Sequence, residues 1–182
     1  QTQLRYHGSK LDASVSYTLS KATNTTEPDG NGIGPNDGNL ARLGEVERGP
    51  SVVDQRHRAV ISVSYRLPYD ITIGTLTQLA SARPFNATTG VDNNGDGANN
   101  DRPVVDGVVL DKSAFRGSPT SDVSAFLEGR VRIGGSAVVL RLEGFNLLNH
   151  GNYLGRGQTV YGNGDTPNAT FGQLVAAGSS TT

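Results

Sequence analysis

The 182-residue sequence contains no cysteine, no methionine and no tryptophan. Without cysteine, a disulfide framework and a zinc–thiolate site are both excluded, and the redox compartment cannot be inferred. An excess of charge of one sign is also missing, because 16 basic residues balance 17 acidic ones. A nucleic-acid partner is therefore not expected, since proteins of that class carry a basic excess that neutralises phosphates.

Long apolar runs are missing as well. Only 35% of the residues are hydrophobic, and no stretch approaches the ~20 apolar residues of a transmembrane helix. Neither an initiator methionine nor a signal-like apolar run stands at Gln1, which favours a chain excised from a longer one. A membrane location stays open, because β-barrel strands alternate between apolar and polar residues and give a weaker signal.

Catalytic signatures are also absent. The histidines are not accompanied by a G-x-S-x-G or an H-E-x-x-H motif, so we expect no enzymatic activity. The run Arg56-His57-Arg58 stands at the start of a predicted strand. We interpret it as a rim element that pairs with Asp54, and an anionic lipid headgroup is the alternative partner.

What the sequence does contain is period-two alternation of apolar and polar residues, which is typical of half-exposed β-strands. In "DASVSYTLSKAT", for example, Ala13, Val15, Tyr17 and Leu19 alternate with serine and threonine. No segment favours a helix. The predicted strands cover residues 2–6, 12–23, 57–68, 71–85, 125–133 and 138–149.

The connections between these strands are of two kinds. Short, turn-forming links hold "HGSK", "PYD" and "GGS", whereas the links at about 24–56, 86–121 and from 150 onward are long and polar. Loops beyond ~12–15 residues are uncommon in compact soluble domains. Alternating tight turns and long loops predict an all-β, antiparallel, up-and-down transmembrane β-barrel segment with short periplasmic turns and long extracellular loops. A soluble β-sandwich with one wet face is the alternative.

Charged residues on the polar sides of the last two predicted strands favour the same interpretation. Glu128, Arg130, Arg132, Arg141 and Glu143 should face away from the apolar side. In a barrel they would line a watery lumen, because a charge facing lipid costs ~2–4 kcal/mol at the membrane midplane. They are our candidates for contact with a substrate.

One loop, "GVDNNGDGANNDRP" from Gly90 to Pro103, resembles the opening of a calcium loop. The acidic residue expected at the twelfth position of an EF-hand is replaced by Pro103, so a helical EF-hand is not predicted. A looser Ca²⁺ site of oxygen ligands remains, and the alternative is a turn-rich loop that binds nothing. The candidate ligands are Asp92, Asn94, Asp96, Asn100 and Asp101.

Several segments are together similar to a known family. They are "YTLSKATN" at 17–24, "DQRHRAVISVSYRLP" at 54–68, "ASARPFNATTGVDNNGDGANNDRP" at 80–103 and "EGFNLLNHGNY" at 143–153. In this order and spacing they resemble the C-terminal part of the barrel in Oar-like TonB-dependent outer-membrane receptors. The resemblance spans nearly the whole chain.

That resemblance implies a plugged barrel of about 22 strands in the outer membrane of a Gram-negative bacterium. It implies contact with outer-membrane lipid, energisation by the TonB complex through a missing N-terminal part, and an unknown bulky substrate. We expect residues 1–182 to form an incomplete barrel domain, without plug or last strand, because about six strands are fewer than the ~8 of the smallest barrels.

Two other functions compete with transport. One is a secreted, calcium-stabilised β-sandwich that acts in binding or adhesion. The other is a structural β-protein that assembles through its open sheet edges, since long unpaired edges invite pairing with other chains.

Overall fold

The computed structural model describes residues 1–25, 48–93, 95, 97, 99, 101–152 and 159–173. The contacts within the chain divide it into two compact units. What we call the sheet unit comprises Gln1–Ser20, Arg56–Ser81 and Pro119–Asn152. What we call the loop unit comprises Lys21–Gln55, Ala82–Ser118 and Tyr153–Thr182.

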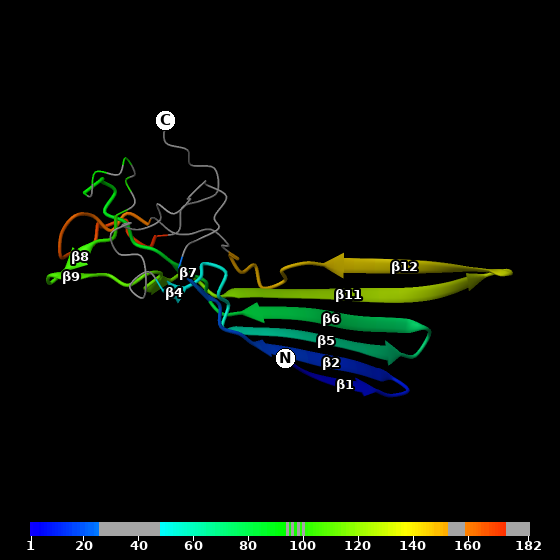
Figure 1. Ribbon diagram of the computed structural model, residues 1–182. Helices are drawn as coiled ribbons and strands as arrows, with labels where there is room; N and C mark the ends of the chain where they lie inside the picture. The colour runs from blue at the N-terminus through cyan, green and yellow to red at the C-terminus, as the bar shows by residue number, and fades with distance from the viewer. Residues whose placement is uncertain are drawn as a thin grey trace. The chain divides into compact units, whose positions relative to one another are not determined.

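The sheet unit is one antiparallel, six-stranded sheet in which each strand pairs with the next along the chain (Figure 1). Its strands are β1 (Thr2–His7), β2 (Leu11–Leu19), β5 (His57–Leu67), β6 (Ile71–Ala80), β11 (Thr120–Ile133) and β12 (Ser136–Gly144). This order is an up-and-down meander, as the sequence predicted. No described residue is helical, and the described ranges hold no helix long and apolar enough to cross a membrane.

The strands of the sheet unit are long. β5 has 11 residues, β6 has 10 and β11 has 14, whereas strands in globular proteins usually have ~5–6. A strand that crosses the hydrocarbon core at a tilt needs ~9–11 residues. These strands therefore have the length that a membrane span requires.

The tight turns form where the sequence predicted them. Between β5 and β6, Tyr69 and Asp70 adopt left-handed backbone angles with φ of 67° and 55°. Between β11 and β12, Gly134 does the same with φ of 61°. Left-handed residues at these positions match the right-handed twist of the flanking strands, so the hairpins close with short links.

Alternation along each strand gives the sheet an apolar and a polar face. On the apolar face, Tyr65 lies opposite Leu11 and Ile73, and Leu127 lies opposite Ile73 and Leu142. The face stays uncovered, since Leu142 is 72% exposed. Among the described residues, the buried hydrophobic side chains Phe85, Ala87 and Tyr161 all belong to the loop unit. A soluble sandwich would instead bury its apolar face against a second sheet.

The predicted strand at 138–149 ends earlier than expected, at Gly144. The next residues turn back, because Asn146 adopts φ of 46° and its side-chain oxygen accepts a hydrogen bond from the His150 amide at 3.1 Å. Asn152 then takes the place of a strand partner for β11. Its side chain accepts from the Ser121 amide and donates to the Ser121 carbonyl, both at 2.7 Å.

The described part of the loop unit contains three two-stranded ladders that the sequence analysis did not predict. They pair β3 (Thr23–Asn24) with β4 (Gly49–Pro50), β7 (Pro84–Phe85) with β10 (Phe115–Arg116), and β8 (Val104–Val105) with β9 (Val108–Val109). The link between β8 and β9 is Asp106-Gly107, with φ of 51° and 77°. An Asp-Gly pair between apolar residues is a strong hairpin signal, so this ladder was readable in the sequence.

Four aromatic rings cluster together within the described part of the loop unit. Phe115 meets Phe171 edge-on with ring centroids 4.8 Å apart, and Tyr161 meets Phe171 at 5.1 Å. Phe85 packs against both phenylalanines at 5.8 Å. Such tilted and edge-on pairs are the arrangements that aromatic quadrupoles favour. The cluster joins segments that lie far apart in the sequence.

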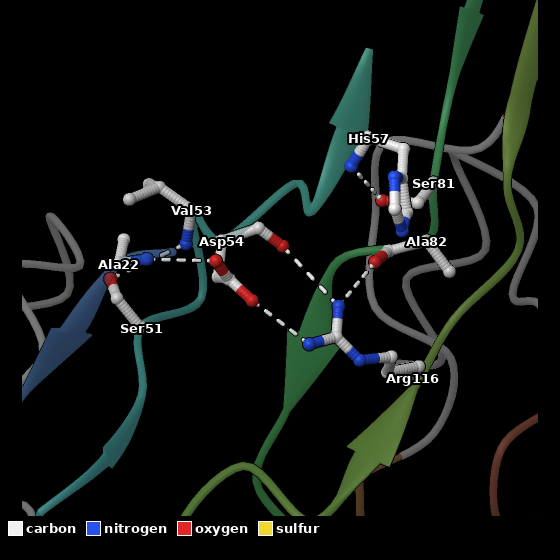
Figure 2. A network of polar contacts seen from close by, with 8 residues as sticks. All are labelled: Ala22, Ser51, Val53, Asp54, His57, Ser81, Ala82 and Arg116. Atoms are coloured by element: carbon white, nitrogen blue, oxygen red, sulfur yellow. Dashed lines mark hydrogen bonds and ion pairs between the residues drawn. The ribbon is translucent and has the colours of Figure 1, made fainter. Parts of the chain in front are cut away.

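A buried ion pair ties two of the long loops together (Figure 2). The Asp54 side chain is only 2% exposed. Its carboxylate accepts a hydrogen bond from the Ala22 amide at 2.8 Å and pairs with Arg116 Nη2 at 2.8 Å. Arg116 also donates to the Ala82 carbonyl at 2.9 Å. The predicted partner of Asp54 was the arginine-rich run at 56–58, but its observed ion pair is with Arg116.

Candidate functional site

The polar face of the sheet carries a charged cluster on the β11–β12 hairpin. Glu128 of β11 lies directly opposite Arg141 of β12, and Glu143 lies opposite Phe126. Arg141 pairs with both carboxylates, through Nη1 to Glu128 at 3.2 Å and through Nε to Glu143 at 2.5 Å. Its guanidinium carbon also lies 4.1 Å from the centroid of the Phe126 ring, which is cation–π geometry.

Phe126 owes its position to a glycine on the neighbouring strand. Gly74 of β6 lies opposite Phe126, and a Cβ atom added to Gly74 would come within 2.3 Å of the Phe126 ring. The ring therefore occupies the space above the glycine, as in aromatic rescue of a strand glycine. The glycine and the ring together hold Arg141 near the surface of the sheet.

The remaining predicted lumen residues lie on the same face, nearer the tight turn. Arg130 lies opposite Val139, and Arg132 lies opposite Ala137. Arg132 approaches Asp70 of the β5–β6 turn at 3.7 Å, with both side chains largely exposed. An exposed pair of this kind contributes little to stability, ~0–1 kcal/mol. Its charges are available to water and to solutes.

A second charged group on the polar face joins the first strands of the sheet. Arg66 Nη2 pairs with Asp12 at 3.0 Å, and Arg66 Nη1 donates to the Ser9 carbonyl at 3.2 Å. His7 Nδ1 also contacts the Asp12 carboxylate. The polar face thus presents paired charges of both signs. Such a surface suits a water-filled lumen that contacts polar solutes by charge and hydrogen bonding.

Tyrosines mark both ends of the apolar face. Tyr6 and Tyr65 lie towards the tight turns and are 58% and 41% exposed. Tyr17 lies towards the opposite end, is 40% exposed, and its hydroxyl is 2.7 Å from His57 Nδ1. Tyrosine is enriched where a membrane meets water, because its ring is apolar and its hydroxyl is polar. These three tyrosines lie where the aromatic girdles of a membrane barrel lie.

The predicted calcium loop is described only in part. Asn94, Asp96 and Asn100 lie outside the described residues. The Asp92 carboxylate accepts hydrogen bonds from the amides of Gly95 at 2.7 Å and Gly97 at 2.9 Å, and Asp101 accepts from the Asn93 amide at 2.6 Å. Within the described ranges no three acidic or histidine side chains gather around one point. Calcium binding therefore stays a prediction.

A long, uncovered apolar face with tyrosine at both ends, backed by a charged face, defines a β-sheet of the transmembrane barrel class. Residues 1–127 match the family described as outer membrane beta barrel domain. The match covers more than half of the chain, and the chain belongs to this family. No curated protein and no solved structure matches the chain.

Family membership fixes the location and the surroundings of the sheet. The chain resides in the outer membrane of a Gram-negative bacterium, where its apolar face contacts lipid. In such barrels the short turns face the periplasm and the long loops face the outside. The end of the sheet at Leu19 and His57 is therefore the outer one. β1 and β12 do not pair with each other, so the six strands form an open sheet and not a closed barrel.

Proposed function

We propose that the chain is part of a TonB-dependent receptor barrel that moves a bulky substrate across the outer membrane. The observation that carries the proposal is the ordered set of sequence segments at 17–24, 54–68, 80–103 and 143–153, which resembles Oar-like receptors. Membership of the outer-membrane barrel family supports the coarser part of this assignment. The long strands and the long loops agree with a large barrel.

In this proposal the polar face contacts the substrate. Glu128, Arg141 and Glu143 form an ion-paired cluster, and Arg130 and Arg132 extend the charged surface towards the periplasmic turns. Charges that already pair with one another can exchange partners with a passing solute at small net cost, because exposed pairs are individually weak. The cluster thus favours a polar or charged substrate over an apolar one.

The test is binding of TonB. The complete outer-membrane product that contains this chain should retain the periplasmic domain of TonB in a pull-down, and deletion of its N-terminal TonB-contacting segment should abolish retention. The same deletion should leave the product in the outer membrane. Absence of TonB binding by the complete product would refute a TonB-dependent mechanism while leaving the barrel assignment intact.

The two competing functions lack a supporting observation. A secreted sandwich requires a buried apolar face, whereas Leu4 and Leu142 are 73% and 72% exposed. Assembly through sheet edges requires free edges at β1 and β12. A barrel needs the same two edges to pair with its neighbouring strands, so the open edges do not favour assembly over a barrel.

A further inference from the structure

A shallow groove lies in the apolar face of the sheet unit, at its outer end. Its volume is about 390 Å³, and it is largely open to its surroundings. The walls are almost entirely apolar. Residues that line it include Tyr17, His57, Ala59, Leu79, Ser81 and Ser121.

The groove arises from alternation of large and small side chains across the strands. Tyr17, Ala59 and Leu79 lie opposite one another on β2, β5 and β6, and Ser121 of β11 follows. The small side chain of Ala59 leaves a hollow between Tyr17 and Leu79. The small side chain of Ser121 leaves further space on the other side of Leu79. The hollow therefore runs across the strands on the side that faces lipid.

A polar rim closes the outer end of this groove. The Tyr17 hydroxyl is 2.7 Å from His57 Nδ1, and the two rings stack with centroids 6.2 Å apart. The His57 amide donates to Ser81 Oγ at 3.1 Å (Figure 2). The contact with Tyr17 orients the imidazole, and the hydrogen bond to Ser81 holds the backbone at the start of β5.

We propose that the groove binds a phosphorylated glycolipid of the outer leaflet. One acyl chain lies along Ala59 and Leu79, and the phosphate lies against His57. The occupant follows from the location, because this surface faces lipid at the outer end of an outer-membrane barrel. The site depends on that location and not on TonB-dependent transport.

A second hollow on the same face provides an internal comparison. It has a volume of about 340 Å³ and lies over Gly129, near the periplasmic end, among Ile71, Leu127, Leu140 and Leu142. A Cβ atom added to Gly129 meets nothing within 4 Å. The lining of this hollow is mostly apolar and contains no histidine or hydroxyl side chain, but it includes Arg141. The Arg141 guanidinium is already paired with Glu128 and Glu143 on the polar face of the sheet, so the hollow can seat an acyl chain without an uncompensated cation beside it.

The test is native mass spectrometry of the full chain in detergent micelles, with lipid A or phosphatidylglycerol added at equal concentration. The wild-type chain should retain lipid A in preference to phosphatidylglycerol. Ala59→Trp fills the groove and His57→Ala removes the rim, and each should lower retention of lipid A about tenfold, equivalent to ~1.4 kcal/mol. Gly129→Leu fills only the second hollow and should retain lipid A as the wild type does.

Circular dichroism verifies the sheet in each variant, and His57→Ala decides the question if Ala59→Trp fails to fold. Equal retention of lipid A by wild type and His57→Ala would overturn the proposal. Equal retention of the two lipids by the wild type would also overturn it, because the groove would then select an acyl chain without its headgroup. If only Gly129→Leu lowered the retention of lipid A, the lipid would bind in the second hollow. That result would also overturn the proposal.

Discussion

Asp54 shows how one residue can organise a long loop. Its carboxylate is almost fully buried, and it satisfies both the Ala22 amide and Arg116. A buried carboxylate is stable only when its charge is paired and hydrogen-bonded. The residue therefore specifies one arrangement of two loops that the sequence alone presents as unstructured polar links.

We expect Asp54→Ala to loosen the loop unit without disturbing the sheet. Loss of the charged hydrogen bonds should cost ~1–3 kcal/mol, and the rate of limited proteolysis in the loops should rise about tenfold, because cleavage follows the population of the opened state. Asp111→Ala is the matched control, since Asp111 is an exposed acid of the same unit. Equal cleavage rates in the two variants would contradict a clamping role.

Calcium binding at Asp92–Asp101 also belongs to the residue scale. If the loop coordinates Ca²⁺, isothermal titration of the full chain should give a dissociation constant of ~10⁻⁴–10⁻³ M, the range of extracellular calcium modules. Asp92→Asn should abolish the heat of binding, because it removes a charged ligand, and Asp111→Asn should not. No heat in the wild-type chain would mean that the acidic residues serve only as turn formers, as the hydrogen bonds of Asp92 to Gly95 and Gly97 already illustrate.

At the scale of elements, the sheet depends on how paired strands share space. Gly74 and Gly129 are both strand glycines, yet their surroundings differ. The Phe126 ring covers Gly74 on the polar face, whereas Gly129 has open space on the apolar face. The same substitution should therefore have different effects at the two positions.

Gly74→Val should destabilise the chain by ~1–3 kcal/mol, because the new side chain forces Phe126 to shift and releases Arg141 from the ring. Gly129→Val should be neutral or stabilising, since it fills space facing lipid and valine favours strands. Urea unfolding of both variants in phosphatidylcholine vesicles measures the difference. A larger loss for Gly129→Val than for Gly74→Val would show that the packing of Phe126 on Gly74 is unimportant.

The sequence predicted the long strands better than the loops, for a physical reason. A strand in a sheet with one apolar and one polar face needs alternating apolar and polar residues. The segment "HRAVISVSYRLP" has this alternation, so its local sequence suffices to identify β5. The contacts of Phe85 with Phe171, and of Asp54 with Arg116, join residues far apart in the sequence and carry no periodic signal. The end of β12 at Gly144 was missed because Asn146 and Asn152 override the apolar pattern with side-chain hydrogen bonds to the backbone.

The candidate site divides in the same way. The charged residues of β11 and β12 were identifiable because their strand positions set the face on which they lie, and the register places Glu128 opposite Arg141. The Tyr17–His57 pair was not predicted, since it depends on the pairing of β2 with β5 across a long connection. Whether the charged face contacts a substrate stays a prediction.

At the scale of the whole molecule, the account depends on one assignment. In this assignment the sheet crosses the outer membrane with its apolar face in lipid, and the prediction that its polar face lines a watery lumen follows from it. A soluble protein would bury the apolar face, and a sheet lying flat on a membrane would place all apolar positions at one depth. The sequence contains no tryptophan, so a single introduced tryptophan reports on one position without background from another.

The most direct measurement is quenching of tryptophan fluorescence by brominated acyl chains, with the full chain in phosphatidylcholine vesicles. Ile61 and Ser62 are neighbours in β5 and lie on opposite faces of the sheet. We predict strong quenching in Ile61→Trp and weak quenching in Ser62→Trp, whose fluorescence should instead respond to iodide in the water phase. Equal quenching of the two variants by the brominated lipid, or quenching of neither, would contradict a membrane-spanning sheet.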